Sequence, residues 1–330
     1  MQQSENLIPR YFCTLFDSGY LFKGVVMLRT LRLHCAGANV FVLCMDDPCR
    51  RILEQLGLPG VTCISLAEIE SSELLAVKKD RNIAEYCWTL SPCFPAWLME
   101  QYPEIDMLTY VDADLMFFSS LEPLFDEIGD SSIAIIEHRF TPRLLHLESR
   151  GRFCVEWVSF RRNAEGLSCL NKWREQCLEW CYDRLENGRM GDQKYLDEWP
   201  VRYPRTHVLQ HPGAGLAPWN FPNYAVSESL PDQITVDGSP LIFYHFHQFQ
   251  LLDDGSFHRL GSVYLQDGNE PEAVYAAYEK ALTEVIAEVR SVVPTFSAGL
   301  KSTMQINSRK WIQRYVPRRI KEALKRFIKY

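Results

Sequence analysis

Short apolar runs alternate with amphipathic stretches along the first 140 residues of the chain. The apolar runs lie at residues 11–16, 39–45, 61–66 and 108–111. Between them, apolar positions recur with a helical period at residues 19–33, 47–56 and 92–101. Apolar strands separated by helices of this length are typical of βαβ units, whose mostly parallel sheet is covered on both faces. The pattern therefore predicts an α/β fold with a mostly parallel, mixed sheet flanked by helices.

The second half of the chain continues this pattern less regularly. Further elements are expected as strands at residues 153–160 and 241–246, a long helix through Trp173, Trp180 and Tyr182, a turn and short helix at 188–199, and helices at 271–292 and 308–328. Glycine and proline are frequent between residues 207 and 224, which indicates a structured loop. We predict one large α/β domain at 1–265 and a C-terminal helical segment at 266–330.

The composition is that of a globular protein with an acidic body and a basic end. Among 330 residues, 47% are hydrophobic and 23% are charged, which suits a large core and excludes a disordered chain. Residues 301–330 hold ten Lys or Arg and a single acid, so this segment carries +9. Because the whole chain carries −7, the first 300 residues carry −16, which argues against nucleic acid as a partner.

Targeting signals and cysteine usage point to the cytoplasm. The N-terminus lacks the basic-then-apolar order of a signal peptide, and no apolar run approaches the roughly 20 residues that cross a bilayer. The eleven cysteines form no C-x-x-C pair, which is typical of reduced, buried thiols. Cys177 and Cys181 share a helix face, but no histidine pair lies nearby, so we interpret them as packing residues rather than zinc ligands.

Two aspartates directly follow the fourth apolar run. Asp112 and Asp114 stand at the carboxyl end of this predicted strand, where open α/β sheets bind ligands. Two neighbouring carboxylates in apolar surroundings repel each other, so a cation is expected between them. Their hard oxygen atoms suit Mg²⁺ or Mn²⁺, which can in turn bridge a diphosphate. The alternative is that Asp112 caps a turn and Asp114 faces water.

A pair of histidines ends the late apolar run. His245 and His247 point to one side of a strand and Phe246 to the other, because strand side chains alternate. An imidazole beside carboxylates favours Mn²⁺ over Mg²⁺. We therefore expect a metal ligand here. The alternative is that each imidazole is a buried core residue with its hydrogen bonds satisfied.

In their order along the chain, these residues resemble a known family. The motifs are Thr14, Asp17 and Tyr20, then Tyr110-Val111-Asp112-Ala113-Asp114, then Gly191-Asp192-Gln193, then His245-Phe246. Between about residues 10 and 247 they resemble the GT-A glycosyltransferases of the glycogenin and lipopolysaccharide galactosyltransferase (family 8-like) group. The first strand–helix junction has no G-x-G-x-x-G, which disfavours a Rossmann dehydrogenase. The resemblance implies a GT-A nucleotide-diphospho-sugar transferase fold and a retaining, Mn²⁺-dependent transfer, mostly from UDP-sugars.

The resemblance also implies residues that bind the nucleotide-sugar. Asp17 and Tyr20 would pair with and stack on the nucleobase, and Thr14 belongs to the same junction. A turn and a helix cap would explain Asp17 as well. Gly213 is expected at the donor, since the glycines of the loop at 211–220 let backbone approach a ligand. The same loop is either an acceptor wall, with Trp219 as a stacking face, or a rigid loop around a buried tryptophan.

Metal-binding and catalytic roles follow in the same way. The implied metal ligands are Asp112, Asp114 and His245. Asp112 would also lie near the ribose. His247 would either contact a metal ligand without binding the metal itself, or donate a hydrogen bond to a phosphate. Asp192 and Gln193 match the pair beneath the transferred sugar, where a carboxylate or amide oxygen can stabilise an oxocarbenium-like centre. The alternative is that Asp192 is simply the N-cap of a short helix.

The chain departs from the family pattern at two places. Gln248 replaces the Gly of His-Phe/Tyr-x-Gly, and Cys154 and Glu156 replace the small polar Asn-x-Gly pattern that often touches the donor sugar. The second departure leaves the transferred sugar open and supports one alternative, a catalytically inactive GT-A-fold protein that docks at a membrane surface. A sugar-nucleotide pyrophosphorylase is another alternative, but the Gly-rich, basic loop of such enzymes is missing after the first strand.

The C-terminal segment predicts contact with a membrane. An apolar stripe of Ile312, Val316, Ile320, Leu324 and Phe327 runs through a segment rich in Lys, Arg and aromatic residues. A basic amphipathic helix of this kind binds anionic membrane surfaces, although it could instead pack on the domain. The resembled galactosyltransferases carry a similar segment and act on lipid-linked acceptors. We therefore expect a glycan or lipid-linked saccharide acceptor and a cytoplasmic, peripheral location on the inner face of the membrane.

Overall fold

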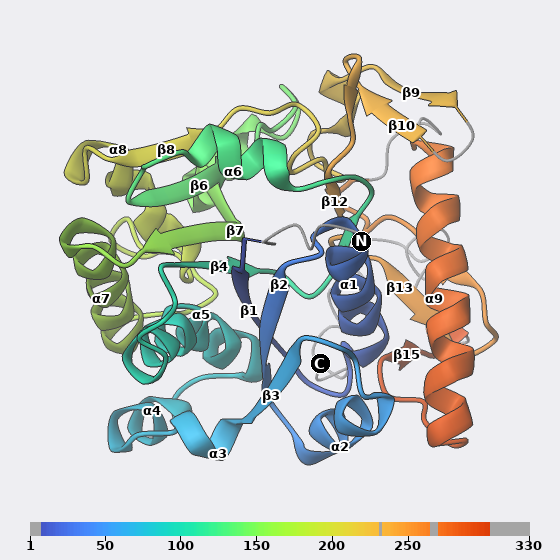
Figure 1. The fold of residues 1–330 in the computed structure, drawn as a ribbon, viewed down its shortest axis with the longest axis horizontal. Coiled ribbons are helices and arrows are strands. Elements are labelled where there is room, and N and C mark those ends of the chain that lie inside the picture. The colour runs from blue at the N-terminus through green and yellow to red at the C-terminus, as the bar shows by residue number, and fades with distance from the viewer. Residues whose placement is uncertain (1–7, 231–232, 265–269, 304–330) are drawn as a thin grey trace, which may run out of the picture.

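The computed structural model describes residues 8–230, 233–264 and 270–303. A seven-stranded sheet runs through this part in the order β3-β2-β1-β4-β7-β6-β8 (Figure 1). Its strands are β1 (Arg10–Phe16), β2 (Ala38–Cys44), β3 (Val61–Ser65), β4 (Met107–Val111), β6 (Ile133–Glu137), β7 (Phe153–Arg161) and β8 (Thr206–Leu209). Among these seven described strands β7 alone runs against the others, since it is antiparallel to β4 and β6. The predicted α/β fold is confirmed.

Helices cover both faces of this sheet and enclose two apolar cores (Figure 1). The first core is lined by α1 (Leu21–His34), α2 (Asp47–Leu56), α6 (Glu122–Ile128) and α9 (Glu272–Val292). The second is lined by α3 (Leu66–Ile69), α4 (Ser72–Lys78), α5 (Ile83–Gln101) and α7 (Ala164–Glu179). Successive side chains of β1 point alternately into the two cores, so both faces of this strand are buried. Phe12 and Phe16 enter the first core, and Cys13 and Leu15 enter the second.

Helix α5 begins earlier than the sequence pattern indicates. It starts at Ile83, where the Asn82 side chain accepts a hydrogen bond from the Glu85 N–H at 3.0 Å. The Glu85 carboxylate in turn accepts the Asn82 N–H at 2.9 Å, which completes a capping box. The predicted start at residue 92 is therefore wrong: Pro92 and Pro95 lie inside the helix. Proline suits a first turn, but the capping signal ten residues earlier determines where this helix begins.

Smaller elements connect the sheet to the C-terminal half. The remaining helices of the described part are α8 (Trp199–Arg202) and the 3₁₀ helices η1 (Leu145–Arg150), η2 (Gln193–Glu198) and η3 (Phe221–Asn223). The short strands are β5 (Leu115–Phe117), β9 (Val226–Leu230), β10 (Gln233–Val236), β11 (Ser239–Pro240), β12 (Phe243–His245), β13 (Gln250–Leu252), β14 (Phe257–His258) and β15 (Leu300–Lys301). Strand β8 corrects the start of the loop predicted at 207–224, because its residues pair in parallel with β6.

Helix α9 belongs to the same apolar core as α1. The Tyr278 ring of α9 stacks on Phe246 with ring centres 3.6 Å apart, and Tyr275 hydrogen-bonds Tyr244 through their hydroxyl groups at 3.0 Å. The predicted division of the chain at residue 265 stays a prediction, although α9 shares its core with the preceding domain. The helix predicted at 308–328 lies outside the described residues.

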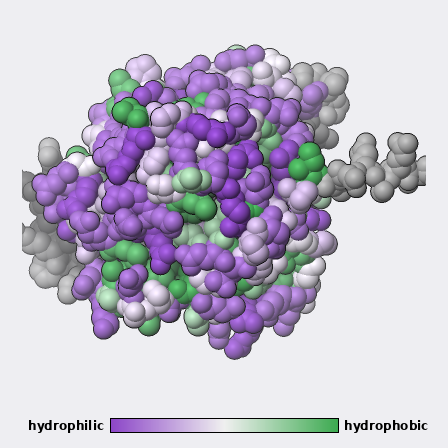
Figure 2. All heavy atoms as spheres, turned by 60° about the vertical axis from the view of Figure 1, so that its left-hand side comes forward, coloured by the Kyte–Doolittle hydropathy of each residue, from purple (hydrophilic) through white to green (hydrophobic). Residues whose placement is uncertain are grey.

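The face of the molecule drawn in Figure 2 is mostly hydrophilic. Hydrophobic residues appear there as small groups separated by hydrophilic ones. Scattered apolar side chains of this kind are ordinary on a protein surface. Among the described residues, no helix combines the length and the apolar composition needed to span a bilayer.

Candidate active site

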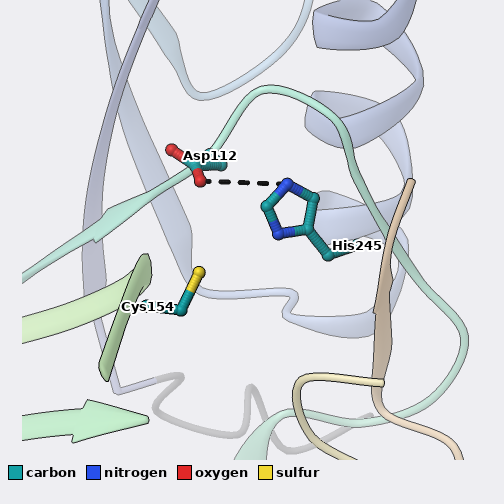
Figure 3. A group of neighbouring side chains, drawn as sticks. All are labelled: Asp112, Cys154 and His245. Atoms are coloured by element: carbon teal, nitrogen blue, oxygen red, sulfur yellow. Dashed lines mark ion pairs between the residues drawn. The ribbon is translucent and has the colours of Figure 1, made fainter. Parts of the chain in front are cut away.

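The carboxyl end of β4 carries the predicted metal-binding aspartates. Strand β4 ends directly before Asp112, and a turn at residues 112–114 leads into β5. Strand β12 pairs antiparallel with β5, and this pairing brings His245 over the turn. In Figure 3 the His245 ring points toward the Asp112 carboxylate. Residues far apart in the sequence thus meet at the edge of the sheet where the prediction places them.

His245 lies close to both of the predicted aspartate ligands. His245 Nε2 is 3.0 Å from Asp114 Oδ1 and 3.9 Å from Asp112 Oδ2. Asp114 is only 5% exposed and His245 only 4%. The alternative in which Asp114 faces water is therefore wrong.

Strand β7 adds two side chains to this site. Because β7 is antiparallel to β4, its first residues lie at the edge where β4 ends. Glu156 is fully buried, and its Oε2 lies 2.6 Å from His245 Nδ1. The Cys154 sulfur, an Asp112 oxygen and a His245 nitrogen all lie within 4.8 Å of one another (Figure 3). The β7 residues flagged as departures from the family pattern are therefore part of the site.

Burial and charge shift the pKa values of these groups strongly. Burial raises the pKa of Asp112 to about 7, with a further rise from Asp114 and an opposing effect from His245. Burial would also raise the pKa of Asp114, but the charges of His245 and Lys23 outweigh it and hold this pKa well below its usual range. Burial would lower the pKa of His245, yet Asp114 and Glu156 raise it well above its usual value. The opposite directions of these shifts show that the charges of the buried groups act strongly on one another.

Helix α1 places an ammonium group beside these groups. Lys23 is 7% exposed, and its Nζ lies 3.7 Å from Asp114 Oδ2. The same nitrogen lies 4.6 Å from the centre of the Tyr20 ring. Tyr20 itself is 45% exposed, and the charge of Asp114, followed by burial, raises the pKa of its hydroxyl above the usual value. The site therefore has an accessible aromatic ring at its rim and a buried cation near that ring.

The predicted nucleotide-binding junction divides into a rim and a buried part. Asp17 Oδ1 accepts a hydrogen bond from the Tyr20 backbone N–H at 3.2 Å, so the turn interpretation of Asp17 holds. Thr14 is fully buried within β1, and its hydroxyl has no hydrogen-bond partner. The structure thus places Asp17 and Tyr20 at the surface of the junction and Thr14 beneath it.

The segment that follows α9 packs over this junction. Gly299, with φ of +82°, approaches the Gly19 carbonyl so closely that no Cβ would fit. Nearby, the Phe296 ring packs against Phe22 of α1 with centres 5.3 Å apart. The positive charge of Lys301 adds to the burial that lowers the pKa of Lys23. Sequence reasoning gave no indication of this contact between the two ends of the described chain.

The side chains of the predicted catalytic residues, Asp192 and Gln193, have different partners in the structure. Asp192 is 5% exposed and stands at the N-cap position of η2, but its side chain makes no capping hydrogen bond. Burial raises the pKa of Asp192 to about 7, a hydrogen bond from Ser91 opposes the rise, and the charge of Asp112 adds to it. Gln193 Nε2 instead donates to the Arg150 carbonyl at 3.1 Å. Asp192 therefore lies within the field of the acidic cluster, whereas the Gln193 amide binds the loop before β7.

His247 lies beside His245, with ring centres 5.6 Å apart. Its Nδ1 lies 3.0 Å from the Tyr264 hydroxyl, and burial together with the charge of His245 lowers its pKa to about 3. The next residue, Gln248, has φ of +62°, in the left-handed region that favours glycine. The backbone therefore keeps the conformation expected of the family's Gly, even though the side chain differs.

The loop at 211–220 packs behind the histidines. Trp219 is 3% exposed, and its ring centre lies 5.1 Å from that of His245 and 5.5 Å from that of His247. Of the two interpretations left open for this loop, the buried tryptophan is the one that holds. Gly213 packs against the Pro240 carbonyl, and its own carbonyl accepts the Ile242 N–H at 2.7 Å. The close approach that Gly213 permits is thus to the strand segment before β12.

Sequence reasoning missed Lys23 and the role of Glu156. Both carried a signal, because each is a charged residue within an otherwise apolar stretch: Lys23 on the buried face of α1, and Glu156 in the middle of β7. A buried charge needs a partner, so such residues often mark a site. The direction of β7, which decides where Glu156 lies, is not readable from that signal.

Comparisons with known proteins agree with this architecture. No family model matches the chain. The apo-form glycosyltransferase GlyE of Streptococcus pneumoniae TIGR4 superposes with a TM-score of 0.50 at 16% identity, over 85% of this chain and 64% of that one. The chain therefore has a GT-A glycosyltransferase fold, as its sequence predicts.

Two proteins of similar sequence show the family to which the chain belongs. YfnD of Bacillus subtilis (strain 168) is 32% identical over 292 residues, which is 88% of this chain and 94% of YfnD. YfnF of the same organism is 29% identical over 293 residues, which is 87% of this chain and 96% of YfnF. Both relatives are described as uncharacterized. The chain belongs to the family of YfnD.

Proposed function

We propose that the chain is a metal-dependent glycosyltransferase that moves a sugar from a nucleotide-sugar to a glycan or lipid-linked acceptor. The fold is compatible with many activities, so the argument depends on the site. One observation carries it: Asp112, Asp114 and His245 converge at the carboxyl edge of β4. Such a cluster is suited to a divalent cation and, through it, to a diphosphate.

The two distances from the His245 nitrogen are compatible with ligands of a six-coordinate cation. With metal–ligand distances of about 2.1 Å, adjacent ligands of an octahedron lie about 3 Å apart and opposite ligands about 4 Å apart. The His245 nitrogen lies 3.0 Å from the Asp114 oxygen and 3.9 Å from the Asp112 oxygen, which agrees with this range. Carboxylates with one imidazole suit Mn²⁺, with Mg²⁺ as the harder alternative. These three residues would hold the metal, which when bound stabilises the leaving diphosphate as a Lewis acid.

The chain's own residues would bind and orient the donor. The exposed Tyr20 ring can stack on a nucleobase, and the Asp17 carboxylate can accept a hydrogen bond from an imide N–H, which favours a UDP-linked sugar. The Lys23 ammonium, close to the acidic cluster, can attract the diphosphate through its charge. Asp192 would lie beneath the transferred sugar and stabilise positive charge at its anomeric carbon, in a reaction that retains configuration.

Calorimetric titration of UDP and of GDP, with and without Mn²⁺, tests the donor site. For the wild type we expect UDP to bind only with Mn²⁺ present. Asp114→Ala should lose this binding, while Asp126→Ala, an exposed aspartate on α6, should keep it. Absence of binding by either nucleotide under any condition would overturn the proposal, whereas Mn²⁺-dependent binding of GDP alone would overturn only the choice of uridine.

Transfer itself is tested with a panel of UDP-sugars. Many transferases slowly release their sugar to water when the acceptor is missing, so release of UDP identifies the sugar without knowledge of the acceptor. We expect one sugar to be preferred and the anomeric configuration of the product, measured by NMR, to equal that of the donor. Inversion would contradict the role given to Asp192.

We propose a membrane-surface location from the charge of the C-terminal segment. Residues 301–330 carry +9, which is enough to favour contact with anionic lipid headgroups. The full chain is expected to sediment with vesicles that contain phosphatidylglycerol and to stay free with neutral phosphatidylcholine vesicles. Replacement of the Lys and Arg residues between 309 and 329 by Gln should abolish sedimentation. Equal sedimentation of both forms would contradict the proposal.

A further inference from the structure

We infer that Glu156 is a positioning residue, which holds His245 so that its Nε2 is directed to the metal proposed between Asp112 and Asp114. The inference rests on the proposed function, since it concerns the same metal site. The residue type is unexpected there, because the resembled family has a glycine in the corresponding pattern. Glu156 is thus a feature of this chain that the family resemblance does not supply.

The two nitrogens of His245 face different partners. Nδ1 lies 2.6 Å from Glu156 Oε2, which is a short, charge-assisted hydrogen-bond distance. Nε2 lies 3.0 Å from Asp114 on the opposite side of the ring. When Nδ1–H donates to Glu156, the proton is fixed on that nitrogen, and the lone pair of Nε2 is available to a cation. The geometry therefore assigns one nitrogen to orientation and the other to ligation.

Glu156 has little else to do in the fold. It is 0% exposed, and its second oxygen, Oε1, is buried without a hydrogen-bond partner. A buried charge with one unsatisfied oxygen costs stability unless it serves another purpose. Among the described residues, the Glu156 side chain hydrogen-bonds His245 alone, so that purpose lies at the histidine.

An irregularity in β7 aims Glu156 at the histidine. Phe153 and Val155 face one core, and Val158 faces the same core although regular alternation would turn it to the other. The register with β6 shifts at this point, where Ile135 pairs with Val158 and the next residue pairs with Cys154. A bulge of this kind re-aims a side chain without interrupting the strand. The turned segment contains Glu156.

Cys154 is another group near the His245 ring, and it must be distinguished from Glu156. Its sulfur lies within 4.8 Å of a ring nitrogen, but a thiol is a weak hydrogen-bond partner beside a carboxylate at 2.6 Å. Loss of the Glu156 carboxylate should therefore weaken metal binding more than loss of the Cys154 thiol does.

The experiment measures the Kd of the full chain for Mn²⁺ by electron paramagnetic resonance of the free ion, without nucleotide or acceptor. We compare wild type with Glu156→Gln, Glu156→Ala and Cys154→Ala. Glu127→Gln is the matched control, because Glu127 forms the same kind of pair with His207 away from the site. Urea unfolding of each metal-free protein supplies a second readout.

Glu156→Ala should weaken Mn²⁺ binding about 10- to 100-fold, the usual range for residues that orient a metal-bound histidine. Glu156→Gln, which keeps the shape but not the charge, should weaken it less, and Cys154→Ala and Glu127→Gln should leave it near the wild-type value. An unchanged Kd in both Glu156 variants, with a wild type that binds Mn²⁺, would overturn the inference. If Glu156→Ala does not fold, the near-isosteric Glu156→Gln decides. A wild type that binds no Mn²⁺ overturns the proposed metal site itself.

Discussion

The described part of the chain contains two histidine–glutamate pairs that are alike in chemistry and opposite in setting. His245 and Glu156 are 2.6 Å apart, with side chains 5% and 0% exposed. His207 and Glu127 are 2.9 Å apart, with side chains 28% and 21% exposed. The distances are similar, so the length of the contact does not tell the pairs apart.

What differs is the number of hydrogen bonds left unmade. Both oxygens of Glu127 accept a backbone N–H, from Gln210 at 2.5 Å and from His211 at 3.2 Å. Glu156 has an oxygen with no partner, and its histidine faces a second carboxylate. A pair whose hydrogen bonds are all made stabilises the chain around it. A pair with unmatched charge is a place where a ligand can bind.

The largest effect on Mn²⁺ affinity is expected from Asp114→Ala. This change removes the second carboxylate beside His245, which the His207–Glu127 pair lacks. Mn²⁺ affinity should fall by more than the 10- to 100-fold expected for an orienting residue, because a direct ligand is lost. The Kd for Mn²⁺ is measured by titration at constant pH. A fall no larger than that of Asp126→Ala would show that the acidic turn does not bind the metal.

Glu127→Ala should show the opposite profile. It removes three hydrogen bonds to one carboxylate, so the free energy of unfolding should fall by about 3 kcal/mol, while Mn²⁺ affinity stays near wild type. Urea unfolding of the metal-free protein measures the change. The comparison fails if Glu127→Ala lowers metal affinity as much as Glu156→Ala does.

Low pH should destabilise the fold through His138, which is buried and hydrogen-bonds the Arg152 carbonyl instead of a carboxylate. Burial lowers the pKa of His138 to about 4, against an opposing hydrogen bond to the Arg152 carbonyl. Between pH 6.5 and 4 the unfolded chain therefore binds this proton while the folded chain does not, and stability falls as the pH drops. The contribution of this histidine over that window is about 3 kcal/mol.

The measurement compares wild type with His138→Gln by urea unfolding at pH 7.5, 5.5 and 4.5, without metal. Asp112 and Asp192, whose pKa values burial raises to about 7, contribute with the opposite sign, but they do so in both proteins. The gap between the two proteins should therefore narrow toward low pH. A gap independent of pH would show that folding leaves the pKa of His138 unchanged.

The smallest effect is expected at the backbone that follows His245. Gln248 has φ of +62°, so Gln248→Gly relieves backbone strain but also loosens the unfolded chain. These contributions nearly cancel, and the unfolding free energy should change by less than about 1 kcal/mol. Mn²⁺ affinity should stay at the wild-type value. A large loss of either would mean that the glutamine side chain has a role of its own.

The sequence was sufficient to predict most of the fold near the site. The alternating apolar runs led to the order of strands and helices, and Asp112 could be placed because an apolar strand ends directly before it. Helix α5 begins earlier than the predicted residue 92, because the capping box at Asn82 determines its start. Local signals compete at a helix start, and tertiary packing decides which of them is used.

The candidate site was predicted only in part, for a topological reason. His245 was expected beside the aspartates because the family resemblance fixed its partner. Glu156 was visible as a departure, but its place depends on β7 running antiparallel and on the register shift within that strand. Hydrophobic periodicity predicts neither the direction in which a strand runs within the sheet nor the position of a bulge. Gln193 shows the converse, since the motif was recognised but its amide binds the Arg150 carbonyl.

The close approach of Gly299 to Gly19 has a consequence for how the protein is made. The turn that holds Asp17 is synthesised long before Gly299, so it gains this neighbour only late in translation. A nascent or prematurely ended chain can form its early strands without completing this turn. The finished turn, at which we propose that the nucleobase binds, is thus a late product of translation, and the basic segment at 301–330 follows directly after it.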